Sequence, residues 1–339
     1  MILIDATHIN VGGGMGLLRR LINELRGQVE FALLRDIRVK DLDTAGCRVF
    51  DAVPSHCFRR RFYRQHGALF SRVLCFGNVP PPIRLPAPTA TYFHNVLFCE
   101  NYAGEGWRER LQMALKMAYI RHYAENTDHF LVQTDNMVAA LRSAIRERAS
   151  VATVPFFALP RSAAKPSPER RWDHFAYVSE AHSHKNHAVL LAAWRRLLAQ
   201  GRRPGLHLTV TAAYPRVLAE IAELKAAGAA ITNHGQSEPA AIYARCGYQV
   251  YPSLLESFGL GLVEAADAGC AVLAAERPYV HAVVGPYATF DPSSAEALAD
   301  LIRRCSGQVA PASVVKVADR LPELLAWLAH GTPWRTEPS

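Results

Sequence analysis

Short apolar segments rich in β-branched and aromatic residues alternate with longer segments of helical periodicity along most of this chain. Such alternation indicates a parallel sheet covered by helices, because parallel neighbours need a long crossover connection. In the first half, strands are expected over residues 2–6, 30–34, 48–53, 72–76, 91–96, 129–133 and 151–157, and helices over 14–25 and 107–124.

The alternation stops between residues 159 and 171 and then starts again. Pro160, Pro166 and Pro168 lie there among Ser, Lys and Arg without an apolar period, which is typical of a linker. Beyond it, strands are expected over 174–178, 206–211, 231–232, 249–251 and 271–275, and helices over 188–198, 216–227, 239–245, 260–268, 295–305 and 314–329.

The sequence therefore predicts an α/β protein with two Rossmann-like, doubly wound domains in tandem. Its 339 residues exceed the size at which a single core usually stops growing. We expect a first domain over 1–158, a linker over 159–171 and a second domain over 172–339, whose last helix either closes that domain or crosses back onto the first. Ligands of such sheets bind beyond the carboxyl ends of the strands, so two facing domains would create a cleft.

Composition narrows the classes of protein further. A formal net charge of +8 attracts polyanions in general, but zinc-finger spacings, aromatic RNA-binding motifs and long basic repeats are missing, so no nucleic-acid partner is expected. No apolar run reaches the ~18–20 residues that span a bilayer, and residues 1–5 enter a strand pattern without a basic leader, so the chain is expected to be neither secreted nor integral. The 7 cysteines are scattered without a CxxC pair, which fits a reducing cytoplasm.

The segment around two glutamates carries the most chemistry. An expected strand is followed by the loop 252–259 and by a helix that contains Glu264. The first N–H groups of a helix lack intrahelical acceptors and carry partial positive charge, so they suit a diphosphate. Gly259 and Gly261 let backbone approach a ligand closely. Glu256 before the helix and Glu264 within it could then bind hydroxyl groups on either side of that diphosphate, one on a sugar and one on a ribose.

In full, this segment reads Pro252-Ser253-x-x-Glu256-Ser257-Phe258-Gly259-Leu260-x-x-x-Glu264-Ala265 and resembles the E-x7-E signature of GT-B glycosyltransferases of family 4. The resemblance implies that Glu256 contacts the donor sugar and that Glu264 holds the ribose. It assigns further donor contacts to Ser257, Phe258, Gly259 and Leu260. An ordinary helix start with a solvated glutamate would share the spacing but not the whole context.

A glycine-rich loop, residues 12–16, follows the first strand and opens a helix, where backbone can wrap a phosphate or leave room for a sugar. The resemblance places this loop, with Gly13 and Gly14, at the donor and acceptor site. A dinucleotide fingerprint is the alternative, and Asp36 after the second strand could serve it as a ribose ligand. The spacing departs from G-x-G-x-x-G, however, because Arg19 occupies the place of the third glycine.

Two further positions match the same family in order along the chain. His94 ends an expected strand, where a histidine near the reacting sugar could orient the donor and stabilise charge. Lys185, followed by Asn186, matches a lysine that neutralises the diphosphate as the sugar leaves. The arginine that usually accompanies this lysine is missing, because Glu180 or Ala181 stands in its place.

Three histidines lie close together in this part of the sequence: His182, His184 and His187. His182 or His184 could replace the missing arginine, unless the charge comes from elsewhere or turnover is weak. A zinc site is not expected, because no Asp, Glu or Cys completes a ligand set at suitable spacing. The segment 41–43 has D-x-D spacing but lies in an early polar loop. We therefore expect no metal and no cofactor beyond the nucleotide-diphosphate sugar, which is the donor substrate.

The helix expected over 107–124 could either pack on its own domain or contact a membrane surface. One face of it carries Trp107, Leu111, Leu115 and Ala118, with Arg108, Arg110 and Lys116 around them. Most such helices pack on the sheet of their own domain. A basic run in the same domain supplies Arg59, Arg60, Arg61 and Arg64. With these arginines, the helix could instead dock on anionic lipid while the protein reaches a polyprenyl-diphosphate-linked acceptor.

Taken together, the resemblance implies a hexosyltransferase-like enzyme with an acceptor-side first domain and a nucleotide-sugar-binding second domain. The sugar would pass to a hydroxyl of a glycan or lipid-linked acceptor with retention, and His94, Lys185 and Glu256 would act by positioning the donor and stabilising the diphosphate. A bacterial surface-polysaccharide or lipopolysaccharide pathway fits, with a cytoplasmic protein peripheral on the inner membrane face. Two alternatives stay open: a non-catalytic sugar-nucleotide-binding protein, which would explain Glu180, and an NAD-dependent oxidoreductase.

Overall fold

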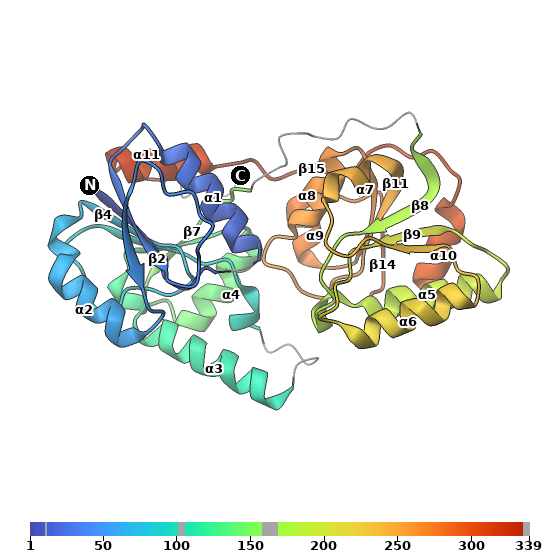
Figure 1. Ribbon diagram of the computed structural model, residues 1–339, viewed down its shortest axis with the longest axis horizontal. Helices are drawn as coiled ribbons and strands as arrows, with labels where there is room; N and C mark the ends of the chain where they lie inside the picture. Colours follow the sequence, from blue (N-terminus) through green and yellow to red (C-terminus); the bar gives the residue numbers. More distant parts are fainter. Residues whose placement is uncertain (11, 101–105, 158–168, 335–339) are drawn as a thin grey trace. The chain divides into compact units, whose positions relative to one another are not determined.

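The computed structural model describes residues 1–10, 12–100, 106–157 and 169–334 (Figure 1). The chain divides into two compact units. Unit 1 comprises Met1–Ala158 and Ala318–Ser339, and unit 2 comprises Leu159–Val317. The second domain, expected to run to residue 339, thus ends at Val317. Most of the expected linker, residues 159–168, lies outside the described residues.

The described residues of unit 1 form a seven-stranded sheet in which all neighbouring strands are parallel, in the order β3-β2-β1-β4-β5-β6-β7. The strands are β1 (Ile2–Ala6), β2 (Phe31–Asp36), β3 (Arg48–Ala52), β4 (Arg72–Cys75), β5 (Thr89–Tyr92), β6 (His129–Val132) and β7 (Ser150–Thr153). The helices are α1 (Gly13–Leu25), α2 (His56–His66), α3 (Trp107–His122), α4 (Asp135–Ile145) and α11 (Leu321–His330), with short turns η1 (Gly67–Leu69), η2 (Val96–Phe98) and η3 (Ala124–Asn126).

Helices cover both faces of this sheet. Successive side chains of a buried strand point to opposite faces, so the apolar side chains on each face need helices to pack against. Ile2 and Ile4 of β1 pack in one core with α1 and α11, while Leu3 packs in another with Phe62 and Tyr63 of α2. Figure 1 shows α11 beside α1. Of the two placements that the sequence leaves open for the last helix, the chain takes the one on unit 1.

Unit 2 contains, in its described residues, a six-stranded parallel sheet of order β10-β9-β8-β11-β12-β14 and a small antiparallel pair, β13 and β15. The strands are β8 (Arg171–Tyr177), β9 (Gly205–Leu208), β10 (Ile231–Asn233), β11 (Cys246–Tyr251), β12 (Ala271–Ala275), β13 (Val284–Gly285), β14 (Ala288–Phe290) and β15 (Val314–Val315). The helices are η4 (Ser183–Lys185), α5 (His187–Ala199), α6 (Pro215–Ala226), α7 (Pro239–Arg245), α8 (Leu260–Asp267), α9 (Pro278–Val283) and α10 (Ala295–Cys305).

The sheet of unit 2 is also covered on both faces. Phe175 of β8 meets the edge of Trp194 of α5, with ring centres 5.8 Å apart. The next residue, Ala176, packs instead with Tyr243 of α7 and Ala265 of α8. Two parallel sheets with helices on both faces confirm the expected α/β class and its doubly wound domains.

Several elements differ from the expectation. The sequence pattern does not predict α2 or α4. In α2 the apolar period is broken, because Arg59 shares the buried face with Phe62 and Tyr63. The helix expected over 314–329 begins only at Leu321, since Val314–Val315 forms the strand β15.

None of the cysteines forms a disulfide, and four of them fill core positions: Cys75, Cys246, Cys270 and Cys305. Among the described residues, no helix combines the length and the apolar character that crossing a membrane requires.

Candidate functional site

Lys185 and Glu256 lie beyond neighbouring strands of unit 2, at the point where the strand order reverses. The chain runs outward from β8 through β9 to β10, and from β11 through β12 to β14, while β8 and β11 are adjacent. The connections that leave such a pair of strands diverge, which leaves a crevice where ligands of doubly wound sheets bind. Lys185 closes η4 after β8 and Glu256 lies in the loop after β11, and Lys185 Nζ is 2.5 Å from Glu256 Oε1.

The Glu256 carboxylate is largely buried and well supplied with donors. Its side chain is 11% exposed, and that of Lys185 is 18% exposed. Tyr251 Oη donates to Glu256 Oε1 over 3.0 Å, and Ser253 gives a further hydrogen bond. Burial acts to raise the pKa of Glu256, but the Lys185 ammonium and the Ser253 hydrogen bond outweigh it and hold that pKa below its ordinary value. Glu256 is therefore ionised at neutral pH.

The loop between Glu256 and α8 is shaped for close backbone approach. Gly259 precedes α8 with φ +79°, a left-handed conformation that favours glycine. A Cβ on Gly261 would lie 3.2 Å from the Tyr251 ring. The Phe258 side chain is 4% exposed and anchors the loop in the core, so only its backbone could meet a donor. The other two predicted donor-binding residues here are the partly exposed Ser257 and Leu260.

Glu264 lies in α8, one turn beyond its start. Burial raises its pKa to about 7, and the nearby Glu238 carboxylate adds to the shift. No hydrogen bond from a described residue contributes to this pKa, in contrast to Glu256. The carboxyl is thus about half ionised at neutral pH and available to hydroxyl groups of a ligand.

A different cluster occupies the place where the resemblance leads us to expect an arginine. Tyr214 Oη donates to Glu180 Oε2 over 2.8 Å, and His182 Nε2 lies 3.1 Å from the same hydroxyl. Burial lowers the pKa of His184 to about 4, so this imidazole is uncharged at neutral pH. His184 is therefore a poor substitute for the arginine, and His182 remains the candidate of the two.

In unit 1, Gly14 and His94 are brought together. A Cβ on Gly14 would lie 3.1 Å from His94 Nε2 and 3.2 Å from Ile9 Cδ1, closer than side chains normally pack. The first turn of α1 can approach the imidazole because position 14 is glycine. Gly12 caps this helix with φ +72°. The Cβ position of Gly13 has open space around it, so the structure itself gives no steric reason for that glycine.

Asn78 fixes the orientation of His94. The His94 backbone N–H donates to Asn78 Oδ1 over 2.7 Å, so the Asn78 amide nitrogen faces His94 Nε2, at 3.4 Å. This arrangement places the imidazole proton on Nδ1, which is buried and has no partner among the described residues. Burial also lowers the pKa of His94 to about 4. His94 can therefore orient a ligand by hydrogen bonding, but it carries no positive charge at neutral pH.

His94 borders a cavity of about 760 Å³ in unit 1, which we call the polar cavity. It lies beyond β1, β4 and β5, and its volume is typical of small-molecule sites. Sequence reasoning missed most of its polar lining: His8, Asn10, Arg38, His56 and Asn78. It singled out Lys116, which also lines the cavity, only as part of a possible membrane-docking helix. A signal existed for His8 and Asn78, because both follow apolar strands of a parallel sheet, where ligand-binding groups gather.

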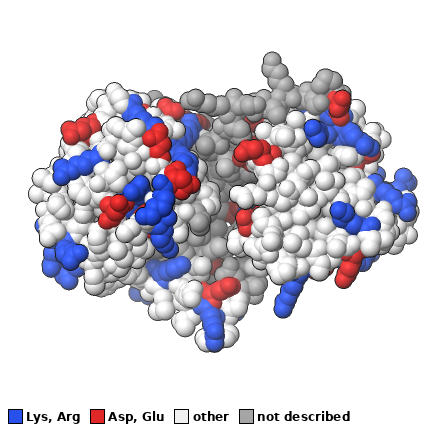
Figure 2. Space-filling view, in the orientation of Figure 1, with Lys and Arg blue, Asp and Glu red and all other residues white. Residues whose placement is uncertain are grey.

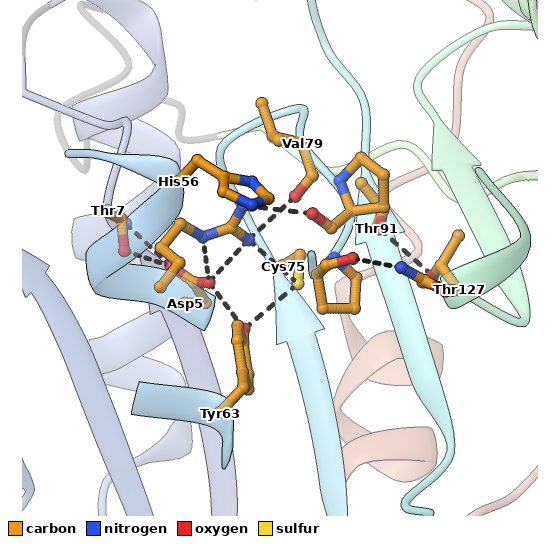
Figure 3. A network of polar contacts seen from close by, with 12 residues as sticks. Asp5, Thr7, His56, Tyr63, Cys75, Val79, Thr91 and Thr127 are labelled. Carbon is orange, nitrogen blue, oxygen red and sulfur yellow. Dashed lines mark hydrogen bonds and ion pairs between the residues drawn. The ribbon is translucent and has the colours of Figure 1, made fainter. Parts of the chain in front are cut away.

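A buried ion pair connects β1 with α2. Arg59 Nε and Nη2 donate to Asp5 Oδ2 over 2.9 and 2.7 Å, and the two side chains are 2% and 1% exposed. Tyr63 and Thr7 also point at the Asp5 carboxylate (Figure 3). The inclusion of Arg59 in an exposed basic run was therefore wrong, because Asp5 pairs with it in the core.

The same arginine secures the loop after β4. Arg59 donates to the carbonyl oxygens of Val79 and Pro80 over 3.2 and 3.1 Å. Asn78, which precedes them, has φ +66° and holds His94. The ion pair thus fixes the backbone that orients His94 at the polar cavity.

Two other acidic features are not ligand sites. Asp36 is completely buried and its carboxylate receives two hydrogen bonds from Arg38, at 2.9 and 2.6 Å, so it is not available to a ribose. This removes one argument for a dinucleotide site. At the surface, Asp41 pairs with Arg19 of α1, and Asp43 pairs with Arg26, which follows that helix. Within the described ranges, no three His, Cys, Asp or Glu residues are grouped so as to hold a metal ion.

Part of the chain is similar to a known protein family. Residues 164–306, which include Lys185, Glu256 and Glu264, match the family model described as glycosyl transferases group 1. No match was found among curated protein sequences.

Solved structures resemble the chain over nearly its whole length. Sucrose-phosphate synthase from Thermosynechococcus elongatus is 18% identical with a TM-score of 0.70, and the match covers 97% of this chain and 94% of that one. A lipopolysaccharide outer core galactosyltransferase is 15% identical with a TM-score of 0.61, covering 97% and 95%. Anabaena HepE, solved with UDP and glucose, is 14% identical with a TM-score of 0.60, covering 96% and 94%. At these identities the likeness establishes a shared fold.

Proposed function

We propose that this chain, in which residues 164–306 match group 1 glycosyl transferases and whose fold is GT-B, transfers a sugar from a nucleotide-diphosphate sugar to a hydroxyl of a glycan or lipid-linked acceptor, with retention of configuration. The observation that carries the proposal is the contact between Lys185 and Glu256 beyond β8 and β11. It puts a cation and a carboxylate where a doubly wound sheet binds its ligand.

Unit 2 holds the donor in this proposal. Glu256 accepts hydrogen bonds from sugar hydroxyls, and Glu264 takes the ribose. The diphosphate lies at the start of α8, where Gly259 leaves room and the helix N–H groups face the ligand. Lys185 leaves Glu256 for the diphosphate, since the ligand carries more negative charge than one carboxylate.

The reaction follows from this placement. The acceptor oxygen bonds to the anomeric carbon as the bond from that carbon to the diphosphate oxygen breaks, and the acceptor proton leaves on the diphosphate. Negative charge grows on the leaving group, next to Lys185 and the start of α8, which stabilise it. His94 orients the reacting sugar as a neutral imidazole. The proposed chemistry uses no metal and no covalent sugar–enzyme intermediate.

The biological setting belongs to the same proposal. The likeness to a lipopolysaccharide galactosyltransferase and to a protein solved with UDP and glucose supports a UDP-sugar donor and a role in bacterial surface polysaccharide synthesis. We place the protein in the cytoplasm, where nucleotide sugars are available to it.

We further propose that unit 1 docks on the inner membrane surface. Arg60, Arg61 and Arg64 of α2 are exposed. Trp107, Leu111 and Leu115 of α3 are 70%, 52% and 62% exposed rather than packed on the sheet. The two helices touch, since His56 Nδ1 and Tyr119 Oη are 2.8 Å apart. Cations beside apolar side chains suit an anionic lipid surface.

Flotation with phosphatidylglycerol vesicles tests the docking. Figure 2 shows Lys and Arg spread among Asp and Glu on the visible face of unit 1, so overall charge does not mark the docking side and specific variants are needed. We expect flotation at low salt that is lost on replacing the three α2 arginines by Gln. Replacing the exposed Arg195, Arg196 and Arg202 of unit 2 should leave it intact. Absent flotation, or equal effects of both triple variants, would contradict the docking.

The main proposal is tested by ligand binding followed by turnover. We expect UDP, GDP or ADP to raise the melting temperature while NAD does not, and the matching nucleotide sugar to be hydrolysed slowly without acceptor. Glu256→Gln should abolish hydrolysis, while Glu276→Gln, at an exposed ion pair with His281, should not. Nucleotide binding without hydrolysis of any donor would make the chain a binding protein, and stabilisation by NAD alone would overturn the proposal.

A further inference from the structure

The loop after β8 and the loop between β9 and α6 are joined beyond neighbouring strands. β8 and β9 are adjacent and parallel. In the first loop, the Ser179 N–H donates to Thr209 Oγ1 over 3.0 Å, just past the end of β9. Tyr214 ends the second loop, directly before α6. Its hydroxyl reaches Glu180 and His182 of the first loop, so Glu180 is part of a cluster at the place where an arginine is expected.

Within this cluster, the hydrogen bonds fix where the protons lie. Tyr214 Oη donates its single proton to Glu180 Oε2 over 2.8 Å. Burial and the hydrogen bond to Glu180 raise the pKa of Tyr214 to about 12, so the hydroxyl keeps this proton at neutral pH. His182 Nε2 lies 3.1 Å from the same hydroxyl, so it must carry a proton and donate it to the Tyr214 oxygen. No other described residue forms a hydrogen bond with the exposed His182 side chain, which leaves Nδ1 accessible to a ligand.

Protonation changes what His182 Nδ1 offers to a ligand. In the neutral imidazole with its proton on Nε2, Nδ1 carries a lone pair, which repels an anion. In the imidazolium, Nδ1 carries a proton and can donate a charge-assisted hydrogen bond to a phosphate oxygen. Histidine changes its charge between pH 5 and pH 8 in ordinary surroundings. The imidazole can therefore bind a phosphate group only in its protonated form.

His182 lies beside the loop that carries Glu256. Its ring is nearly parallel to that of His184, with an angle of 9° between the planes and 5.7 Å between the ring centres. The His184 carbonyl accepts a hydrogen bond from the Leu254 N–H over 2.8 Å, in the Glu256 loop. This backbone contact keeps the two loops together, so the loop that holds His182 borders the proposed donor site.

The charges around His182 favour its protonated form. Tyr214 and His184 contact the imidazole directly, and the Glu180 carboxylate lies behind Tyr214. His184 adds no charge at neutral pH, because burial lowers its pKa to about 4. The Lys185 ammonium is compensated by the carboxylate with which it pairs. Among the described neighbours of the imidazole, Glu180 therefore contributes the dominant charge, and its sign stabilises the imidazolium.

We propose that His182 binds the donor diphosphate in its protonated form only, and that Glu180 and Tyr214 are positioning residues that hold this imidazolium toward the ligand. Donor binding then takes up one proton from the solvent at pH values where the unliganded imidazole has lost it. His182 thereby does with a titratable group what the expected arginine does with a permanent charge. The inference rests on the proposed function, because it adds three residues to the donor site of unit 2.

Calorimetric titration of the full chain with UDP, GDP and ADP between pH 7.5 and pH 8.5 tests the inference. Over this range the terminal phosphate of the nucleotide is fully ionised, since its second pKa is near 6. Glu264, with a pKa of about 7, is mostly ionised as well. We expect the affinity of whichever nucleotide binds to fall by about three- to tenfold across the range, because each complex needs one proton. An affinity that stays constant or rises contradicts the inference.

Replacing the imidazole should remove this pH dependence. His182→Gln should bind the nucleotide about tenfold more weakly at pH 7.5, and its affinity should stay constant up to pH 8.5. His330→Gln is the matched control, since His330 is exposed at the end of α11 in unit 1, and it should retain both the affinity and its fall. If His182→Gln retains the fall with pH, another group takes up the proton and the inference is wrong.

The positioning residues are tested by the pH at which the fall occurs. Glu180→Gln and Tyr214→Phe each remove the influence of the Glu180 carboxylate on His182, so the fall should move to lower pH. Relative to the unaltered protein at the same pH, both variants should bind about three- to tenfold more weakly at pH 7.5 but nearly equally at pH 6. The controls are Glu223→Gln in α6 and Tyr287→Phe, both at exposed side chains of unit 2. Weaker binding by the same factor at every pH would show a merely structural role and contradict the assignment.

Histidine NMR of the full chain reports the proton positions directly. Without ligand, the neutral form of His182 should carry its proton on Nε2, and saturating nucleotide at pH 8 should convert it to the imidazolium. A proton on Nδ1 in the neutral form, or a neutral imidazole in the saturated complex, would overturn the inference.

Nucleotide binding and donor hydrolysis separate this inference from the proposed function. If the chain binds a nucleotide and hydrolyses the corresponding nucleotide sugar while the affinity is independent of His182, glycosyl transfer stands and the role of His182 is wrong. If the protein binds none of the three nucleotides, the proposed donor site fails, whatever the tautomer of His182, and the inference fails with it.

Discussion

Lys185 Nζ lies 2.5 Å from Glu256 Oε1, although 71 positions separate the two residues in the chain. The contact exists because β8 and β11 are neighbours in the sheet and both residues lie beyond the carboxyl ends of these strands. In this arrangement each charge compensates the other until a ligand arrives. The pair thus contributes both to the stability of unit 2 and to the proposed donor site.

Removing the lysine should reveal both contributions. Lys185→Met leaves the largely buried Glu256 carboxylate without its cation, so we expect the free energy of unfolding of unit 2 to fall by about 3 kcal/mol. The double variant with Glu256→Gln should regain most of that stability, because no buried charge remains. Donor hydrolysis should fall on the order of 100-fold in Lys185→Met and should not recover in the double variant.

Urea denaturation and hydrolysis assays measure these effects. Arg303→Met is the control, because Arg303 forms an exposed ion pair with Asp300 in α10 and should change stability by less than about 0.5 kcal/mol. Equal losses in Lys185→Met and Arg303→Met would show that the Lys185–Glu256 pair is not buried in solution.

Nucleotide affinity should depend on the ionisation of Glu264. Its pKa of about 7 lies above the ordinary value, so its ionised fraction rises between pH 6 and pH 8. An ionised carboxylate accepts hydrogen bonds from ribose hydroxyls better than a protonated one, so UDP binding should tighten with pH by up to about tenfold per unit below pH 7. Glu264→Gln should remove this part of the pH dependence.

Calorimetric titration of UDP across this pH range is the measurement. The exposed Glu296 of α10 offers a control, because Glu296→Gln should retain the full pH dependence. The stability of the fold should depend on pH in the opposite direction. The folded chain binds the Glu264 proton more tightly than the unfolded chain does, so the bound proton stabilises the fold. That contribution to the free energy of unfolding is lost as the pH rises from about 5 through 7. A Glu264→Gln variant that binds UDP with unchanged pH dependence would remove Glu264 from the ribose site.

The protonation of His94 should depend on Asn78. Asn78→Asp would put a carboxylate oxygen opposite His94 Nε2, which favours the imidazolium and raises the pKa of His94 from about 4 toward neutrality. Asp tolerates the left-handed backbone at this position. At saturating donor, hydrolysis should then gain an acidic limb near pH 6 that the unaltered protein lacks.

Histidine NMR titration and pH–rate profiles check this expectation. The exposed Asn23 of α1 provides the matched control, since Asn23→Asp should change neither the His94 titration nor the rate profile. An unshifted His94 titration in the folded Asn78→Asp variant would rule out Asn78 as the positioning residue.

Among the arginines of unit 1, Arg59 should contribute most to the free energy of unfolding, because it forms the buried ion pair with Asp5. Arg59→Met removes the cation but leaves the Asp5 carboxylate in the core, so the free energy of unfolding should fall by about 3–5 kcal/mol. Arg60→Met, at the next residue of the same helix, changes an exposed side chain and should cost less than about 0.5 kcal/mol. Similar urea midpoints for the two variants would contradict the burial of Arg59.

The sequence by itself predicts much of the fold. Alternating apolar periods indicate two doubly wound domains because each period reflects local backbone geometry. The pattern fails for α2, where Arg59 interrupts the apolar face. A charge can lie in the core only because Asp5, 54 positions away, pairs with it. Such a long-range partner leaves no trace in a local period.

The candidate site divides in the same way. The segment around Glu256 and Glu264 can be recognised from sequence, because residue types and spacing within one strand–loop–helix connection are local properties. Tertiary structure alone decided three other features. Lys185 contacts Glu256, Gly14 lies against His94, and the side chains of Trp107, Leu111 and Leu115 stay exposed. The physical reason is strand order: which carboxyl ends become neighbours, and which helix faces remain uncovered, depends on how distant strands pair, and a linear pattern does not encode that pairing.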